Sequence, residues 1–302
     1  MFVQPDIKHQ QALPTGFLWV DYLLDGAGLQ RGYLYELIGP PAVGKSSLAM
    51  QLAGQIQRYG GVVVYVDADG SFSPAYARQL GAQTDELIVL HPEHINQLLE
   101  MLHSLHQTIV PDLIILDSLP ALSGQLESEQ TAHPDGALRY YDDLDRLLRY
   151  LTGLMGTHNS VIIACNQYRQ VQDEEGEWVE MPACRHLHQT ADVIFCLAFK
   201  PNTFAPDEGG LEISILQGYT DEFPKRLRGI LDPKCGISPY AEAFLLGVYL
   251  RLINSKENGF VYHEICLGKT LQEALAYLRQ KPQHFYALRQ EIWEGLPQKL
   301  RR

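Results

Sequence analysis

The stretch YLYELIGPPAVGKSSLAMQLAG, residues 33–54, decides the fold of this chain. Its first six residues are nearly all apolar, which is typical of a strand buried on both faces of a sheet. Its last part places Leu48 and Leu52 four residues apart, as on one face of a helix. Between them, GPPAVGKS at residues 39–46 matches in full the pattern GxxxxGK followed by Ser or Thr. The stretch therefore predicts a strand, a phosphate-binding loop and a helix in succession.

The predicted loop binds phosphate mainly through its backbone. Gly39 and Gly44 permit conformations that turn successive N–H groups inward, and the helix N-terminus adds a positive partial charge. Lys45 would reach the β and γ phosphates, and the Ser46 hydroxyl would coordinate Mg²⁺. The complete motif in this setting disfavours a chance glycine-rich loop. We expect the nucleotide to contact Gly39, Pro40, Pro41, Ala42, Val43, Gly44, Lys45, Ser46 and Ser47.

Further short apolar runs follow the same strand pattern, at residues 62–66, 87–90, 112–117, 160–165, 193–199 and 211–216. The runs up to residue 165 are nearly continuous in apolar residues, and helical patterns such as that of residues 95–106 alternate with them. This alternation indicates a parallel sheet covered by helices on both faces. We therefore predict an α/β fold with a mostly parallel sheet.

The pattern changes near DPKCGISP, residues 232–239, where Pro, Gly and Ser cluster after the last apolar run. Beyond it we expect a helix over 241–253, a strand or hairpin over 259–267, and two helices separated by Pro282. This arrangement predicts a small α+β C-terminal domain. The predicted division is a short N-terminal extension (1–14), a core (15–236) and the C-terminal domain (237–302).

The composition bounds the class of protein. The 302 residues carry 24 Lys and Arg against 36 Asp and Glu, a formal net charge of -12. An acidic chain argues against loose, nonspecific nucleic-acid binding. No apolar run approaches the roughly 18 residues of a membrane helix and the first residues lack a signal peptide, so we expect a cytoplasmic protein without a membrane partner. The five cysteines form no CxxC pair, which predicts neither a disulfide framework nor a zinc site.

Polar side chains follow the apolar runs where parallel strands end. Asp117 would hold Mg²⁺ through water, because the end of its strand lies beside the phosphate loop. Asp67 and Asp69 are candidates to orient an attacking water, and Asn166 and Gln167 would sense the γ phosphate. For each aspartate, a solvated strand terminus remains the alternative.

Ordered blocks of the sequence resemble the bacterial branch of the RecA recombinase family. The blocks are TGFLWVDYLLDGAGLQRGYLYELIGPPAVGKSSLAMQLAG (15–54), VYVDADGSFSPAYARQLG (64–81), LIILDSLPAL (113–122) and IIACNQYR (162–169). Residues 236–253 and 271–292 are similar to the family's small C-terminal domain. The resemblance implies a RecA-like P-loop ATPase core that uses ATP and Mg²⁺, binds single-stranded DNA and acts in recombination or repair. It also implies self-association or a RecA-family partner.

The resemblance assigns roles to individual residues. Lys45, Ser46 and Asp117 keep the roles described above, and Gln167 matches the family's switch glutamine. Asp69 falls where the family has the glutamate that activates water, so Asp69, Lys45 and Gln167 form the implied catalytic set. Aspartate is shorter by one methylene, and a misplacement of about 1 Å can cost on the order of a hundredfold in rate. The resemblance therefore implies a slow, DNA-dependent ATPase.

Two further residues are implied to contact the base of the nucleotide. Tyr76 matches the tyrosine that stacks on adenine in the family. Ser73 replaces an acidic neighbour that contacts the base.

The chain departs from the family where the family contacts DNA and neighbouring protomers. Segments 123–136 and 167–189 correspond to the DNA-contacting loops, and both carry more acidic than basic residues. The second resembles a hairpin that turns at residues 175–176. Gln217 and Tyr219 stand where the family has lysines that reach ATP across the protomer interface. The DNA-contact candidates that remain are Arg169, Arg185, His186 and His188.

These observations leave three hypotheses. In the first, the chain is an ATP-binding and ATP-hydrolysing protein of recombination or repair that binds single-stranded DNA. In the second, it is an accessory scaffold that binds ATP and a protein partner without forming DNA filaments; the acidic loops and the few residues before the TG block support it. In the third, it is an ATPase switch outside DNA metabolism, because fold does not determine function.

Overall fold

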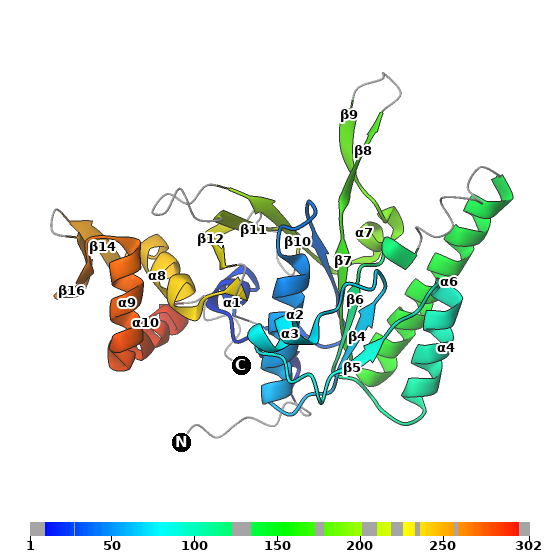
Figure 1. Cartoon of the computed structure of the whole chain (residues 1–302), viewed down its shortest axis with the longest axis horizontal. Coiled ribbons are helices and arrows are strands. Elements are labelled where there is room, and N and C mark those ends of the chain that lie inside the picture. The colour runs from blue at the N-terminus through cyan, green and yellow to red at the C-terminus, as the bar shows by residue number, and fades with distance from the viewer. Residues whose placement is uncertain are drawn as a thin grey trace.

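The computed structural model describes residues 10–26, 28–122, 134–172, 178–200, 210–218, 226–232, 236–256 and 259–295. Within these ranges a nine-stranded sheet forms the centre of the molecule, with helices on both faces (Figure 1). In spatial order its strands are β13 (Gly236–Ile237), β12 (Arg226–Asp232), β11 (Gly210–Gln217), β10 (Val193–Phe199), β3 (Leu34–Ile38), β7 (Val161–Asn166), β6 (Leu113–Asp117), β4 (Val63–Asp67) and β5 (Ile88–Leu90).

The strands from β10 to β5 run parallel, and β11, β12 and β13 extend the sheet in antiparallel pairs. The predicted α/β fold with a mostly parallel sheet is therefore confirmed. The register also aligns the strand ends. Asp67 lies opposite Asp117, and Ile38 lies opposite Asn166. The carboxyl ends of β3, β7, β6 and β4 consequently meet along one edge of the sheet.

Alternating residues of the central strands enter two separate cores. Tyr35 and Leu37 of β3 face one core, and Leu34 and Ile38 face the other. Helices α2 (Lys45–Arg58) and α3 (Pro74–Gln79) contribute to the first core; helices α4 (Ile95–His106), α6 (Pro134–His158) and α7 (Arg185–Thr190) contribute to the second. Burial on both faces explains why these strands are nearly continuous in apolar residues.

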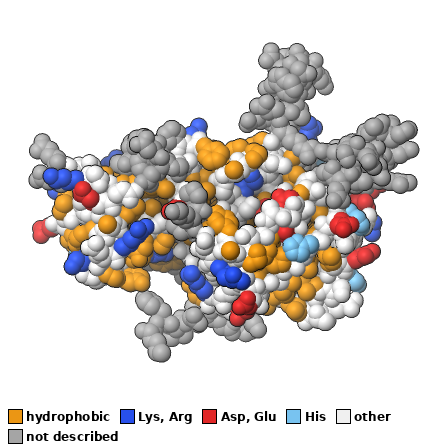
Figure 2. Space-filling model, viewed as in Figure 1, with side chains coloured by type: hydrophobic (Ala, Val, Ile, Leu, Met, Phe, Trp, Pro, Cys, Tyr) orange, Lys and Arg blue, Asp and Glu red, His pale blue; other side chains and the backbone are white. Residues whose placement is uncertain are grey.

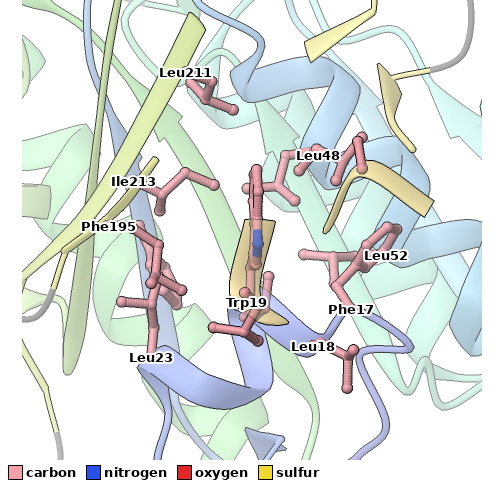
Figure 3. Packing of buried hydrophobic residues seen from close by; sticks show 14 of the residues in the cluster. Phe17, Leu18, Trp19, Leu23, Leu48, Leu52, Phe195, Leu211 and Ile213 are labelled. Carbon is pink, nitrogen blue, oxygen red and sulfur yellow. The ribbon is translucent and has the colours of Figure 1, made fainter. Parts of the chain in front are cut away.

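The segment before the phosphate loop packs into the first core. It forms a small antiparallel pair, β1 (Ala12–Leu13) with β2 (Leu29–Gln30), and helix α1 (Leu18–Leu23). Trp19 of α1 is 1% exposed. Figure 3 shows its indole between Leu48 on one side and Phe195 and Ile213 on the other. This tryptophan therefore joins α1, α2 and the antiparallel part of the sheet.

The C-terminal part of the chain has the predicted mixture of helices and strands (Figure 1). Its elements are α8 (Pro239–Tyr249), β14 (Ile253–Lys256), β15 (Gly259–Tyr262), β16 (Ile265–Gly268), α9 (Leu271–Gln280) and α10 (Pro282–Gly295). The expected hairpin and pair of helices are present. The helix expected over 241–253 ends earlier, at Tyr249, because the chain turns there into β14. The predicted boundary between residues 236 and 237 falls within β13, and the domain division stays a prediction.

The hairpin expected near residues 175–176 is formed by β8 (Tyr168–Gln172) and β9 (Trp178–Pro182), which pair antiparallel. A single residue, Gln167, separates it from the end of β7, and it projects away from the body of the molecule (Figure 1). Its connecting residues 173–177 lie outside the described ranges. The hairpin is thus attached directly to the edge of the sheet where the polar strand ends meet.

Two buried carboxyl groups lie where α1 meets α8. Thr15 Oγ1 donates to Asp21 Oδ1 at 2.6 Å, and the Trp19 N–H donates to Glu242 Oε1 at 2.8 Å. The guanidinium of Arg289 lies 3.6 Å from Glu242 Oε2. Burial raises the pKa of both Asp21 and Glu242 to about 7, although Arg289 opposes the shift. Both groups therefore change charge near neutral pH inside the core.

We expect the free energy of unfolding to fall as the pH rises toward 7. The folded pKa of Glu242 lies above the ordinary 4.5, so its contribution is fully present below 4.5 and is lost as the pH rises through 7. Glu242→Gln keeps an acceptor for Trp19 and should remove about 2 to 3 kcal/mol of this fall. Urea unfolding at pH 5.5 and pH 8 measures it. Glu86→Gln, at an exposed carboxyl, is the control, and parallel pH profiles for the two variants would contradict the prediction.

Candidate functional site

The phosphate loop connects β3 to α2 in a conformation that requires its two motif glycines. Gly44 has a φ of 102°, in the left-handed region that favours glycine. A Cβ at Gly44 would lie 2.2 Å from Leu231 Cδ2, and a Cβ at Gly39 would lie 2.3 Å from the Leu197 carbonyl oxygen. The loop is thus held closely against β10 and β12, and only glycine fits at these positions.

Lys45 and Ser46 open helix α2 beside this loop. The Lys45 ammonium donates to the carbonyl oxygens of Gly39, at 3.0 Å, and Pro40, at 2.8 Å. Burial lowers the pKa of Lys45, while Cys165 and Asp117 oppose the shift. Ser46 is exposed. A cationic head and a solvent-facing hydroxyl therefore lie together at the N-terminus of a helix, where anions are favoured.

The other predicted loop contacts differ in what they present to a ligand. Pro41 and Ala42 are exposed, whereas the Val43 side chain is fully buried in the core. Val43 can therefore offer a ligand only its backbone. Ser47 Oγ lies 2.9 Å from Tyr76 Oη, which ties the first turn of α2 to α3.

Asp117 ends β6 with a buried carboxylate, 4% exposed. The Tyr65 hydroxyl of β4 donates to its Oδ2 at 2.5 Å. Burial and the charge of Asp117 together raise the pKa of Tyr65, so the hydroxyl remains a donor. Burial, followed by Asp117, also raises the pKa of Cys165 in β7. Tyr65 is not among the site residues predicted from the sequence, where its one signal is a hydroxyl-bearing ring among the valines of β4.

Asp67 and Asp69, two residues apart at the end of β4, have different environments. Asp67 is 3% exposed; its carboxylate accepts from the Ser71 N–H at 3.0 Å and the Phe72 N–H at 3.2 Å, and lies 3.2 Å from His91 Nδ1. Asp67 therefore anchors the turn that follows it. Asp69 is exposed and accepts from the Ser71 N–H at 3.2 Å. Of the two, Asp69 is the carboxylate that a solvent molecule can reach.

Ser73 and Tyr76, the residues implied to contact adenine, lie at the start of α3. Ser73 Oγ caps this helix by accepting from the Tyr76 N–H at 3.4 Å. Tyr76 is half-buried, and its ring packs against the first core. Their contact with a base stays a prediction.

Asn166, at the end of β7, is the centre of a buried hydrogen-bond network. Its Nδ2 donates to Glu36 Oε1 at 2.5 Å and to the Cys184 carbonyl at 3.1 Å. Its Oδ1 accepts from the Gln167 N–H at 2.9 Å and the Cys184 N–H at 3.2 Å. His188 Nδ1 lies 2.6 Å from the other oxygen of Glu36. Burial raises the pKa of Glu36, although Asn166 and His188 oppose the shift. Asn166 thus fastens both ends of the hairpin and leaves Gln167 at the edge of the sheet.

Two of the four predicted DNA-contact residues form hydrogen bonds within the protein. His188 bonds the buried Glu36, and His186 Nδ1 lies 2.9 Å from Asp145 Oδ1. Arg185 is exposed at the start of α7. The Arg169 side chain lies outside the part that the structure describes. Contact of these residues with DNA stays a prediction.

The predicted positions at the protomer interface and in the acidic loop are only partly described. Gln217 Nε2 donates to the Ala191 carbonyl at 2.8 Å, and Tyr219 lies outside the described residues. Residues 123–133 of the acidic segment also lie outside them. Across the ranges that are described, no three His, Cys, Asp or Glu side chains are grouped as metal ligands. Nor does any helix in those ranges have the length and apolar character to cross a membrane.

Phosphate loop, lysine and strand-end carboxylates on a mostly parallel sheet define the class of P-loop nucleotide-binding proteins. Residues 3–173 match the model of the RecA N-terminal domain. The chain is 29% identical over 287 residues to Protein RecA of Thermus thermophilus, an alignment that covers 93% of this chain and 84% of that protein. It is 35% identical over 165 residues to Protein RecA of Geobacter metallireducens, covering 55% and 48% respectively. The chain therefore belongs to the RecA family, as a divergent member.

Membership in this family identifies the chain as a RecA-family protein of recombination and repair. The family resemblance seen in the ordered sequence blocks is confirmed.

Proposed function

We propose that this chain binds ATP with Mg²⁺ on the loop at residues 39–46, hydrolyses it slowly, and binds single-stranded DNA in an ATP-dependent way. One observation carries the proposal. Asp117 ends β6, and Lys45, Gln167 and Asp69 follow β3, β7 and β4 in the chain. The four strands are consecutive neighbours in the sheet. A cation, an amide and two carboxylates thus meet at one edge, as nucleotide hydrolysis requires.

The residues present suit a magnesium ion. The Ser46 hydroxyl and the Asp117 carboxylate are oxygen ligands of the kind that Mg²⁺ prefers, and both lie at the edge of the sheet beside the loop. When bound, the ion would neutralise phosphate charge. Lys45 would turn from the loop carbonyls to the phosphate oxygens and stabilise the charge on the transferred group.

The remaining polar groups would act on the water and report the nucleotide. Asp69, exposed at the end of β4, would orient the attacking water and accept its proton. Gln167 would bond the γ phosphate. The residue after it begins β8, so a shift of Gln167 would move the hairpin. We propose that this hairpin carries the DNA contacts, with Arg169 and Arg185 nearest its two ends.

The distribution of surface charge affects how strongly the chain would bind DNA. Figure 2 shows Lys and Arg side chains as scattered groups on one face, with acidic side chains among them. Arg228 forms an ion pair with Glu212 at 3.0 Å, so a carboxylate already balances the charge of this arginine. Few phosphate contacts predict a shallow dependence of affinity on salt. We therefore expect weaker nucleotide-independent DNA binding than a basic surface would provide.

Fluorescence anisotropy of a labelled single-stranded oligonucleotide tests the proposal. At low salt we expect binding with a slowly hydrolysed ATP analogue and much less binding without it. Electron microscopy of the same samples shows whether copies assemble along the DNA. If the chain binds the analogue but no DNA at low salt, the DNA part of the proposal is wrong and the accessory-scaffold hypothesis replaces it.

Asp69→Glu should raise the turnover of ATP. The extra methylene moves the carboxylate about 1 Å toward the water, and an error of that size can cost on the order of a hundredfold in rate. We expect a gain of about tenfold or more in kcat, measured as phosphate release with DNA present. Asp67→Glu is the control, because Asp67 anchors a turn and its lengthening should give no gain. A glutamate variant at position 69 that is no faster than wild type would contradict the role of Asp69.

A further inference from the structure

Tyr65 links two strands of the nucleotide site through one hydroxyl. Its backbone pairs with Ile115 of β6, two residues before Asp117, and its ring crosses toward the end of that strand. The hydroxyl donates to Asp117 Oδ2 at 2.5 Å. The ring packs against Phe72, with 5.4 Å between ring centroids, and the residue is 3% exposed. Packing and hydrogen bond together hold Tyr65 in a single position.

This contact determines how Asp117 presents its two carboxylate oxygens. A carboxylate at a strand end can rotate about its Cβ–Cγ bond, and it then offers either oxygen to a neighbouring ligand. Here a short hydrogen bond to a charged acceptor, one of the stronger kinds in proteins, engages Oδ2. The Cys165 thiol is a second hydrogen-bond partner of this carboxylate, and Oδ1 is the oxygen that Tyr65 leaves to other partners. Groups that hydrogen-bond a metal-binding carboxylate in this way typically contribute 10-fold to 100-fold to metal affinity.

We propose that Tyr65 is a positioning residue for the magnesium carboxylate: its hydroxyl fixes the orientation in which Asp117 holds the ion through water. The inference rests on the proposed nucleotide site. Tyr65 contacts neither nucleotide nor metal, and it acts through Asp117. Because its ring also packs on Phe72, in the segment that follows Asp69, Tyr65 connects the magnesium carboxylate to the segment that carries the proposed water-orienting group.

The competing explanation is that a buried tyrosine simply satisfies its hydroxyl with the nearest acceptor. The chain offers a matched control for this explanation. Tyr35, on β3 of the same sheet, is also buried, and its hydroxyl accepts from the Gln30 N–H at 2.6 Å. Tyr35→Phe removes the same atom from the same sheet without touching Asp117. Loss of a buried hydroxyl is therefore common to both variants, and contact with the carboxylate is not.

The experiment titrates Mg²⁺ against binding of a fluorescent ATP analogue by wild type, Tyr65→Phe and Tyr35→Phe. We expect the half-saturating Mg²⁺ concentration to rise about tenfold or more for Tyr65→Phe and to stay at the wild-type value for Tyr35→Phe. Thermal unfolding shows that both variants fold. If Tyr65→Phe has the same Mg²⁺ requirement as wild type, or a lower one, the inference is wrong.

A double-mutant cycle with Asp117→Asn completes the test. If Tyr65 acts through Asp117, Tyr65→Phe should add little to the Mg²⁺ requirement of Asp117→Asn. Independent, multiplying effects would overturn the inference. Its failure differs from failure of the proposed function: wild type without Mg²⁺-dependent nucleotide binding would remove the site itself, whereas an intact wild type with an unaffected Tyr65→Phe removes only the role of Tyr65.

Discussion

Lys45→Ala is expected to lower ATP turnover by about a hundredfold or more, the scale found when one charge-stabilising group is removed from an active site. The ammonium lies over the phosphate loop, 3.0 Å from the Gly39 carbonyl and 2.8 Å from that of Pro40. Its removal would leave the developing phosphate charge to the loop N–H groups, Gln167 and the bound Mg²⁺.

The measurement is steady-state phosphate release together with binding of a fluorescent ATP analogue. Lys45→Arg keeps the charge but replaces a compact ammonium with a planar fork, so it should recover only part of the activity. Arg58→Ala, at the far end of α2 and exposed, should behave as wild type. Binding and turnover at wild-type levels in Lys45→Ala would show that the loop at residues 39–46 is not the ATP site.

Gly229→Ala should have the largest effect on stability. A Cβ at this position of β12 would lie 1.0 Å from Cη2 of Trp19, whose indole is 1% exposed. Leu48 and Phe195 lie on either side of that indole, so it cannot move aside without displacing them (Figure 3). Overpacking a core typically costs 1 to 3 kcal/mol, and a clash this close places the expected loss at about 3 kcal/mol or more.

Urea unfolding measures this loss as a lower midpoint. Gly153→Ala, in helix α6 with open space around its Cβ position, is the matched control and should retain or slightly increase stability. Trp19→Leu should create space beside position 229. Gly229→Ala should therefore lower the midpoint less in the Trp19→Leu background than in wild type. Equal midpoints for Gly229→Ala and wild type would show that the β12 contact with Trp19 is not rigid.

Strand β12 escapes prediction from the sequence for a physical reason. It is antiparallel and lies near the end of the sheet, and its exposed Arg226 and Arg228 alternate with the buried Leu227 and Gly229. A strand solvated on one face lacks the continuous apolar run that marks the others. The two arginines consequently resemble a basic surface cluster, whereas Arg228 pairs with Glu212 of β11 at 3.0 Å.

The sequence by itself determined the phosphate loop, the buried parallel strands and the position of Asp117 at a strand end. Each of these depends on residues that are neighbours in the chain. Only the tertiary structure decided which polar groups are engaged. It separated Asp67, held by Phe72 and His91, from the exposed Asp69. It also joined Tyr65 to Asp117, residues that are 52 positions apart. Hydrogen bonds between strands depend on register and side-chain direction, and no local pattern in the chain encodes either of these.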